Sequence, residues 1–167
     1  VGKQLGAMIS AICEADLYTC AFDTVAYPIT PKGRSLADWE KALAGIQARG
    51  GTSCGVAIDQ LRRREQWVEQ IVLVTDEGEN TAPKFEYAYQ RYAESMGMKP
   101  AVILVRVGRA IDYVQRVCHK LGVAPNVFEF KGDYYALPNV IPMLTYPSLA
   151  DMVMEVLDYP LPQRAPA

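Results

Sequence analysis

The sequence lacks two features that would define whole classes of protein. Its longest apolar runs, such as residues 100–105, are far shorter than the about 20 residues needed to span a bilayer. It also lacks an excess of positive charge, since 17 Lys and Arg stand against 19 Asp and Glu for a formal net charge of −2. A membrane-spanning protein is therefore not expected, and a strongly basic nucleic-acid binder is disfavoured.

Histidine and cysteine are also scarce. The one histidine, His119, has no identifiable nucleophile and acid partner with which to form a catalytic triad. The four cysteines show neither CxxC spacing nor the density of a small disulfide scaffold. The first residues lack the apolar core and cleavage site of a signal peptide, so a cytoplasmic protein is expected.

What is present is typical of one globular domain. The chain has 167 residues, of which 50% are hydrophobic and 22% are charged, so it should fold around a core of its own. Residues 160–162 read Pro-Leu-Pro and should end the last helix. We therefore expect a domain over residues 1–162 and a flexible tail over 163–167.

Hydrophobic periodicity predicts helices that alternate with strands. Residues 70–75 and 101–107 are apolar on both faces, which is typical of strands in a parallel sheet covered by helices on each side. Shorter strands are predicted at 17–22, 25–27 and 126–130, and helices at 5–12, 36–46, 53–64, 85–96, 111–121 and 149–157. This order indicates a three-layer, Rossmann-like α/β fold with an open, mostly parallel sheet and helices on both faces.

Two polar loops are expected at the carboxyl edge of this sheet, where open α/β folds bind their ligands. Residues 50–53, Gly-Gly-Thr-Ser, offer hydroxyls beside backbone N–H groups, and residues 76–79, Asp-Glu-Gly-Glu, offer three carboxylates. Hard oxygen ligands of this kind suit Mg²⁺, Mn²⁺ or Ca²⁺ rather than zinc. Thr52 and Asp76 are therefore candidate metal ligands.

Each of these residues also has a purely structural interpretation. Thr52 follows glycines and is a normal helix N-cap, while Asp76 is a normal turn residue after a strand. Glu77 and Glu79 are better explained as solvated side chains or partners of a helix dipole than as direct ligands. A metal-dependent hydrolase that used Asp76 and Glu77 would require a nucleophile or activated water that the sequence does not identify.

The order of elements and the two loops resemble the von Willebrand factor A (vWA) domain. The metal-ion-dependent adhesion site (MIDAS) of that family combines a DxSxS loop after the first strand, a threonine in a Gly-Gly-Thr-like loop and an aspartate in a T-D-x-x loop. Here Gly-Gly-Thr-Ser at 50–53 and Thr-Asp-Glu-Gly at 75–78 stand in the matching order. The chain looks most similar to the carboxyl-terminal vWA domains of bacterial TROVE-type, Ro-like proteins, which the segment V-T-D-E-G-E-N at 74–80 also resembles.

The resemblance implies a binding module and not an enzyme. Thr52 and Asp76 would hold Mg²⁺, or Mn²⁺ or Ca²⁺, and an acidic side chain of a protein partner would complete the coordination. The alternative that it implies is the vWA half of a Ro-like RNA-binding protein, with RNA bound through an adjacent domain. Weak support for RNA comes from the three arginines at residues 62–64 and from five tyrosines, Tyr87, Tyr89, Tyr92, Tyr134 and Tyr135. A helix dipole explains the arginines more simply, and packing of half-buried side chains at an α/β surface explains the tyrosines more simply.

One part of the family pattern is missing, namely the DxSxS motif and the strand that carries it. In the family this strand lies between those that correspond to residues 17–22 and 70–75, so the domain is expected to be incomplete at its N-terminus. Unpaired buried backbone groups cost about 1–3 kcal/mol each. We therefore expect the strand to come either from an upstream piece of a longer polypeptide, which is the favoured source and would also bring DxSxS, or from another chain. The metal site is expected to be incomplete in this chain alone.

Overall fold

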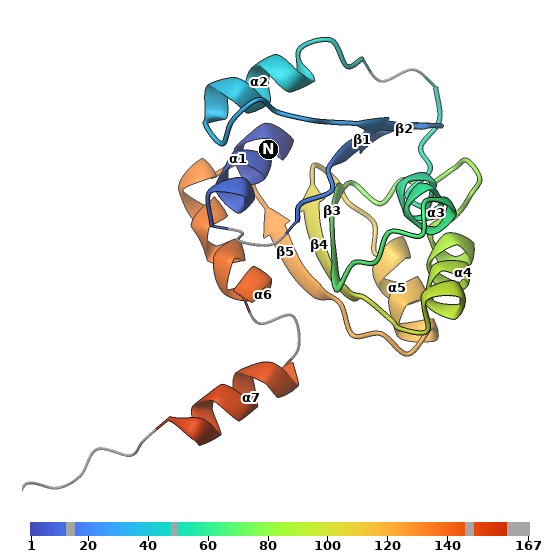
Figure 1. The fold of residues 1–167 in the computed structure, drawn as a ribbon, viewed down its shortest axis with the longest axis vertical. Coiled ribbons are helices and arrows are strands. Elements are labelled where there is room, and N and C mark those ends of the chain that lie inside the picture. Colours follow the sequence, from blue (N-terminus) through green and yellow to red (C-terminus); the bar gives the residue numbers. More distant parts are fainter. Residues whose placement is uncertain (13–15, 48–49, 146–148, 160–167) are drawn as a thin grey trace, which may run out of the picture.

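The computed structural model describes residues 1–12, 16–47, 50–145 and 149–159, in which helices alternate with strands (Figure 1). The strands are β1 (Cys20–Phe22), β2 (Ala26–Pro28), β3 (Gln70–Thr75), β4 (Ala101–Val107) and β5 (Asn126–Phe130). The helices are α1 (Gly2–Ile12), α2 (Leu36–Leu43), α3 (Val56–Arg63), α4 (Phe85–Met96), α5 (Tyr113–Lys120), the 3₁₀ helix η1 (Tyr134–Val140), α6 (Ile141–Thr145) and α7 (Leu149–Asp158). The predicted α/β class is confirmed.

The strands form two separate sheets among the described residues. β3, β4 and β5 are parallel and lie in that order, with Thr75 opposite Arg106 and Val107 opposite Phe130. β1 and β2 form an antiparallel hairpin of their own. β1 and β3 do not pair with each other among the described residues, and the expectation that other polypeptide lies between them stays a prediction.

Helices cover both faces of the three-stranded sheet. Figure 1 shows α3, α4 and α5 on one side and α1 and α6 on the other. Each side has its own hydrophobic cluster, and β4 contributes to both because Leu104 faces one cluster while Ile103 and Val105 face the other. This three-layer arrangement explains why β4 is apolar on both faces.

Local signals account for where several helices begin and end. Ser35 caps α2, since its Oγ accepts a hydrogen bond from Asp38 N at 3.2 Å while the Asp38 carboxylate accepts one from Ser35 N at 3.2 Å. Gly97 ends α4 in the left-handed conformation, with φ of 68°. α1 packs on α2 through Gly6, where any side chain would overlap the ring of Trp39.

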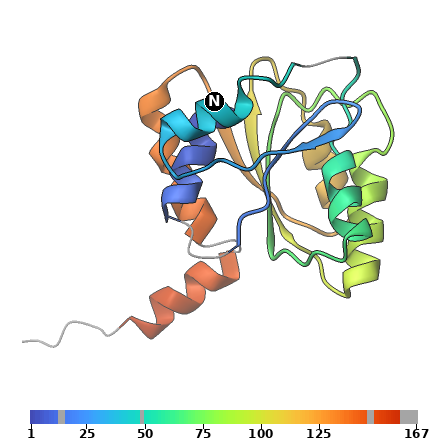
Figure 2. The same cartoon turned by 45° about the horizontal axis from the view of Figure 1, so that its top comes forward.

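Several predicted elements are shorter than expected. Strand β1 starts at Cys20 rather than at residue 17, and α3 starts at Val56 rather than at residue 53. Helix α2 ends at Leu43 rather than at residue 46, and α5 covers Tyr113–Lys120 rather than 111–121. The last helix, α7, extends away from the other helices (Figures 1 and 2), and the tail predicted at 163–167 lies outside the described residues. In the described part of the chain, no helix combines the length and apolar character that crossing a membrane requires.

Candidate functional site

The two loops predicted from the sequence lie together at the carboxyl end of β3. The carbonyl oxygen of Thr52 accepts hydrogen bonds from the N–H groups of Asn80 and Thr81, at 3.0 Å each. In return, Thr52 N donates to Asn80 Oδ1 at 2.8 Å. Gly51 must be glycine for this approach, because a Cβ there would overlap the Thr81 hydroxyl. Asn80 was not singled out from the sequence, yet it holds the two loops together.

The residues after Thr52 bind the first loop to the β1–β2 hairpin and to the segment that precedes α4. Ser53 is fully buried, and its N–H donates to the carbonyl of Asp23 at 2.7 Å, in the turn of the β1–β2 hairpin. The Ser53 hydroxyl donates to the carbonyl of Pro83 at 2.5 Å. Cys54 N donates to Glu79 Oε1 at 3.0 Å. These bonds keep residues 52–54 out of the helix, so Gly55 is the N-cap of α3 and the N-cap interpretation of Thr52 is wrong.

Glu79 joins the first loop to the start of α4. Besides the bond from Cys54 N, its Oε1 accepts one from Phe85 N at 2.7 Å, at the first residue of that helix. Burial raises the pKa of the Glu79 carboxyl, while the hydrogen bonds from Phe85 and Cys54 lower it in part. The other oxygen, Oε2, is buried and has no hydrogen-bond partner among the described residues.

Glu77, in the same loop, binds to residues of β4 and α5. Its side chain is fully buried, and its backbone has φ of 60°, a conformation uncommon outside glycine. Oε2 accepts hydrogen bonds from Val114 N at 2.6 Å and from Gln115 N at 3.1 Å, at the N-terminus of α5. Oε1 accepts one from Arg106 Nε at 2.5 Å. The helix-dipole interpretation of Glu77 is therefore confirmed, and the solvated one is wrong.

Arg106 is the ion-pair partner of Glu77, and it was not predicted from the sequence. It lies near the end of β4, and besides its ion pair with Glu77 it donates from Nη2 to Gln115 Oε1 at 2.5 Å. Its Nη1 also lies 3.7 Å from Glu129 Oε1. One signal was available: arginine is the only charged residue in the segment Ala-Val-Ile-Leu-Val-Arg-Val, and a charge in a buried strand needs a partner nearby.

Thr52 and Asp76 are the two predicted ligands, and each keeps a side-chain oxygen that accepts no hydrogen bond from another described residue. Asp76 is exposed; its Oδ1 accepts a hydrogen bond from Gly78 N at 2.9 Å, and its carbonyl accepts one from Ile111 N at 3.2 Å. Thr52 is half-buried, and no hydrogen bond joins its hydroxyl to another described residue. Sharing of one ion by these two side chains stays a prediction.

The chemistry of this donor set fits part of a coordination shell for a hard cation. In the described ranges, no three or more His, Cys, Asp or Glu side chains are grouped so that they could hold a metal ion. Burial raises the pKa of the Cys54 thiol to about 12, so this thiol is protonated at neutral pH. A hydroxyl and a carboxylate suit Mg²⁺, but they leave most of its octahedron to water or to other groups.

Several of the residues considered for RNA binding form ion pairs within the chain or are buried in its core. Arg62 and Arg63, in the last turn of α3, both pair with Asp59, at 2.9 and 2.7 Å. The tyrosines are not half-buried as predicted: Tyr89 and Tyr92 are buried in the core, whereas Tyr87, Tyr134 and Tyr135 are exposed. His119 lies on the exposed side of α5.

Comparison with known proteins supports the fold. No protein-family model matches the chain, and no curated protein sequence matches it. Among solved structures, the chain is similar to the RO (RSR) protein of Deinococcus radiodurans, which carries a vWA domain, with a TM-score of 0.55 and 21% sequence identity. The match covers 83% of this chain and 27% of the length of that protein. The resemblance to a vWA domain of a Ro-like protein is confirmed at the level of the fold.

Proposed function

We propose that the chain is a binding module that captures an acidic side chain of a protein partner through a divalent cation. The cation would lie at the carboxyl edge of the sheet, with Thr52 and Asp76 as its ligands from this chain. The observation that carries the proposal is the clasp between the two loops, in which Thr52 and Asn80 exchange hydrogen bonds in both directions. This clasp puts a hydroxyl and an exposed carboxylate on neighbouring loops at the edge where α/β folds bind ligands.

The roles of the acidic residues in the second loop support this assignment. Glu77 and Glu79 accept hydrogen bonds from the N-termini of α5 and α4, whereas Asp76 leaves its Oδ2 available. A bound Mg²⁺ would supply the positive charge that attracts a partner's carboxylate. Asp76 would contribute a charged oxygen ligand, and Thr52 would contribute its hydroxyl directly or through water.

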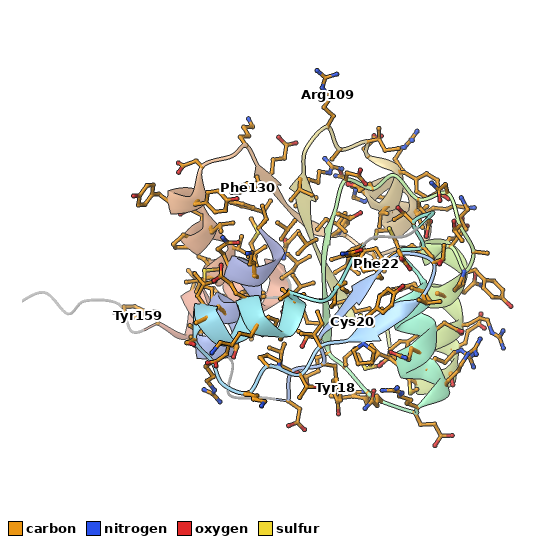
Figure 3. The ribbon with its side chains drawn as sticks, turned by 90° about the horizontal axis from the view of Figure 1, so that it is seen from above. Tyr18, Cys20, Phe22, Arg109, Phe130 and Tyr159 are labelled. Carbon is orange, nitrogen blue, oxygen red and sulfur yellow. The ribbon has the colours of Figure 1, made fainter. Side chains whose placement is uncertain are left out.

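The surroundings of Asp76 favour an acidic partner. Residues 108–112 form the adjacent loop, which is tied to Asp76 by the hydrogen bond from Ile111 N. In this loop Arg109 is exposed and extends away from the fold, as seen from above in Figure 3. A positive side chain near the candidate cation site would increase the association rate of an acidic partner.

We propose binding rather than catalysis at this edge. A metal-dependent hydrolase would use Glu77 with Asp76, but the Glu77 carboxylate is fully buried and accepts three hydrogen bonds. It has no access to a substrate or to a metal-bound water. Asp76 alone would provide no general base held against a nucleophile.

A second candidate function is favoured by the comparison with the Ro protein. The chain could act as the vWA half of a larger, Ro-like protein in which an adjacent domain binds RNA. The fold similarity supports that arrangement. The pairing of Arg62 and Arg63 with Asp59 argues against RNA contacts by this surface of the chain itself. Tight binding of single-stranded RNA by the chain alone would favour a direct RNA role over capture of an acidic protein.

Metal binding by the chain alone tests the incomplete site. Calorimetric titration with Mg²⁺ should show weak or no binding, and Asp76→Ala should barely change the titration, because two side chains cannot offset the dehydration of Mg²⁺. Mn²⁺, added at substoichiometric concentration, should still broaden the amide signals of residues 51–54 and 76–80 first, and less so in the variant. Tight Mg²⁺ binding abolished by Asp76→Ala would contradict the incomplete site, and broadening centred elsewhere would contradict the assignment of Thr52 and Asp76.

A further inference from the structure

The Asn80 side chain holds the two loops together through one of its two polar atoms. Its Oδ1 accepts a hydrogen bond from Thr52 N and another from the Thr81 hydroxyl, at 2.8 Å each. A backbone N–H can only donate, so the atom that faces Thr52 must be the oxygen of the amide and not its nitrogen. The bond from Thr52 N therefore fixes the orientation of the Asn80 amide group.

The other polar atom of Asn80, Nδ2, takes no part in this contact. It carries two N–H donors, and neither is hydrogen-bonded to another described residue. Asn80 is exposed, so a ligand can reach these donors. Nδ2 is bonded to the same carbon as Oδ1, and Oδ1 lies 2.8 Å from Thr52 N. A hydrogen-bond donor thus stands beside Thr52, at the edge of the proposed cation site.

The contact between the loops does not by itself require an amide at position 80. An aspartate would accept the same two hydrogen bonds, and a charged acceptor forms stronger hydrogen bonds than a neutral one. The same loop already carries three carboxylates, those of Asp76, Glu77 and Glu79. Asparagine instead adds a donor and no further negative charge. Both properties favour the approach of an acidic group.

Backbone contacts hold Asn80 in place. Its N–H and that of Thr81 both donate to the carbonyl of Thr52, at 3.0 Å each. Gly51 lies so close that a Cβ there would be 2.5 Å from Asn80 Oδ1. A donor that is already held in one orientation loses little conformational entropy when it binds, which increases its contribution to affinity.

We propose that Asn80 is a specificity-determining residue whose Nδ2 donates a hydrogen bond to the carboxylate of the acidic partner. One oxygen of that carboxylate binds the cation held by Thr52 and Asp76, and the other oxygen accepts the hydrogen bond from Nδ2. The inference rests on the proposed function, because without a cation the Asp76 carboxylate repels an acidic group.

This arrangement selects a carboxylate over an amide of the same shape. An asparagine of a partner could offer its oxygen to the cation, but its NH₂ group would then face Asn80 Nδ2, donor against donor. One of the two groups would be left without an acceptor, which weakens binding. The group recognised at this site is therefore the side chain of aspartate or glutamate, and not that of asparagine or glutamine.

The test uses the isotopically labelled 167-residue chain and two tripeptides blocked at both ends, Gly-Asp-Gly and Gly-Asn-Gly. NMR titrations with each peptide are recorded with a large excess of Mg²⁺ and without it. The side-chain NH₂ signals of Asn80 report the contact, and those of Asn139, an exposed residue of η1, are the internal reference. With Mg²⁺, Gly-Asp-Gly should shift the Asn80 signals until they saturate and leave the Asn139 signals unchanged. Gly-Asn-Gly should bind roughly fivefold or more weakly.

Asn80→Asp separates ligand binding from the contact between the loops. It keeps an acceptor for Thr52 N and for the Thr81 hydroxyl, but it removes the donor and adds a negative charge. Amide hydrogen exchange of Thr52 should therefore stay within about threefold of the parent chain. The affinity for Gly-Asp-Gly should fall by roughly tenfold or more. Asn80→Ala should both weaken peptide binding and speed exchange of Thr52.

Three results would overturn the inference. The first is that neither peptide moves the Asn80 side-chain signals, and the second is that Gly-Asn-Gly binds as tightly as Gly-Asp-Gly. The third is that Asn80→Asp binds Gly-Asp-Gly as tightly as the parent chain while exchange of Thr52 is unchanged. The first two are measured on the parent chain, so they decide the matter even if the variant does not fold.

Failure of the proposed function gives a different result. Equal shifts of the Asn80 signals by Gly-Asp-Gly with and without Mg²⁺ would support the donor role of Asn80 and contradict the cation. Mn²⁺ broadening centred on Thr52 and Asp76, without any shift of the Asn80 side-chain signals by Gly-Asp-Gly, would support the cation site and contradict the role of Asn80.

Discussion

Replacing Glu77 by alanine is expected to destabilise the fold by about 3–5 kcal/mol, the usual cost of removing one partner from a buried ion pair. Glu77 is 0% exposed, and the variant leaves three donors without their acceptor: Arg106 Nε, Val114 N and Gln115 N. Domain stabilities are typically about 5–15 kcal/mol, so a large part of the stability would be lost. Urea unfolding followed by circular dichroism measures this loss.

Asp76→Ala is the matched control for Glu77→Ala. It removes a carboxylate from the neighbouring residue, but Asp76 is exposed and the hydrogen bond that its side chain accepts is a local one, from Gly78 N. We expect a change of about 1 kcal/mol or less. A double variant, Glu77→Gln with Arg106→Met, should recover part of the stability because it removes both buried charges. Equal effects of Glu77→Ala and Asp76→Ala would contradict the structural role of Glu77.

Replacing Gly55 by alanine should also have a large effect. A Cβ at this position would lie 2.6 Å from the carbonyl oxygens of Pro83 and Lys84. Backbone atoms cannot rotate away, so α3 would have to move from α4, at a cost of about 1–3 kcal/mol. Thermal unfolding should show a clear decrease in Tm. Gly45→Ala is the control, because nothing lies within 4 Å of the Cβ that it would add. If both variants unfold at the same temperature, the close packing at Gly55 is wrong.

The sheet could be predicted from the sequence because its pattern is local. Residues 70–75, 101–107 and 126–130 form strands with the predicted bounds. Residues 71–74 and 101–105 are consecutive apolar residues. The burial of residues 102–105 on both faces follows from helices on both sides of the sheet. Where the pattern was weaker, as at residues 17–19, the strand is shorter than predicted.

The start of α3 could not be predicted, because distant residues decide it. Thr52 after two glycines is a normal cap signal, but its N–H and carbonyl bond to Asn80 and Thr81, about 28 residues further along the chain. The N-cap is Gly55 instead. Local propensity is overridden here by contacts between loops that the fold brings together.

The candidate site was predicted in its location but not in its internal structure. The Gly-Gly-Thr-Ser and Asp-Glu-Gly-Glu loops do meet, as parallel strands and their loops require. The sequence could not separate the carboxylates of Asp76, Glu77 and Glu79, because each role depends on which helix N-terminus lies nearby. The burial of Glu77 against Arg106 follows from the register between β3 and β4, in which Thr75 lies opposite Arg106.

The central claim is that one edge of β3 is open, with no strand of the described residues paired to it. Amide hydrogen exchange of the chain alone, resolved by residue along β3 and β4, tests this claim most directly. We predict alternation along residues 70–75, with slow exchange where N–H groups bond to β4 and fast exchange at the positions between them, while residues 102–105 exchange slowly throughout. Uniformly slow exchange along 70–75 in the monomeric chain would show that the edge is already paired, and would contradict the account.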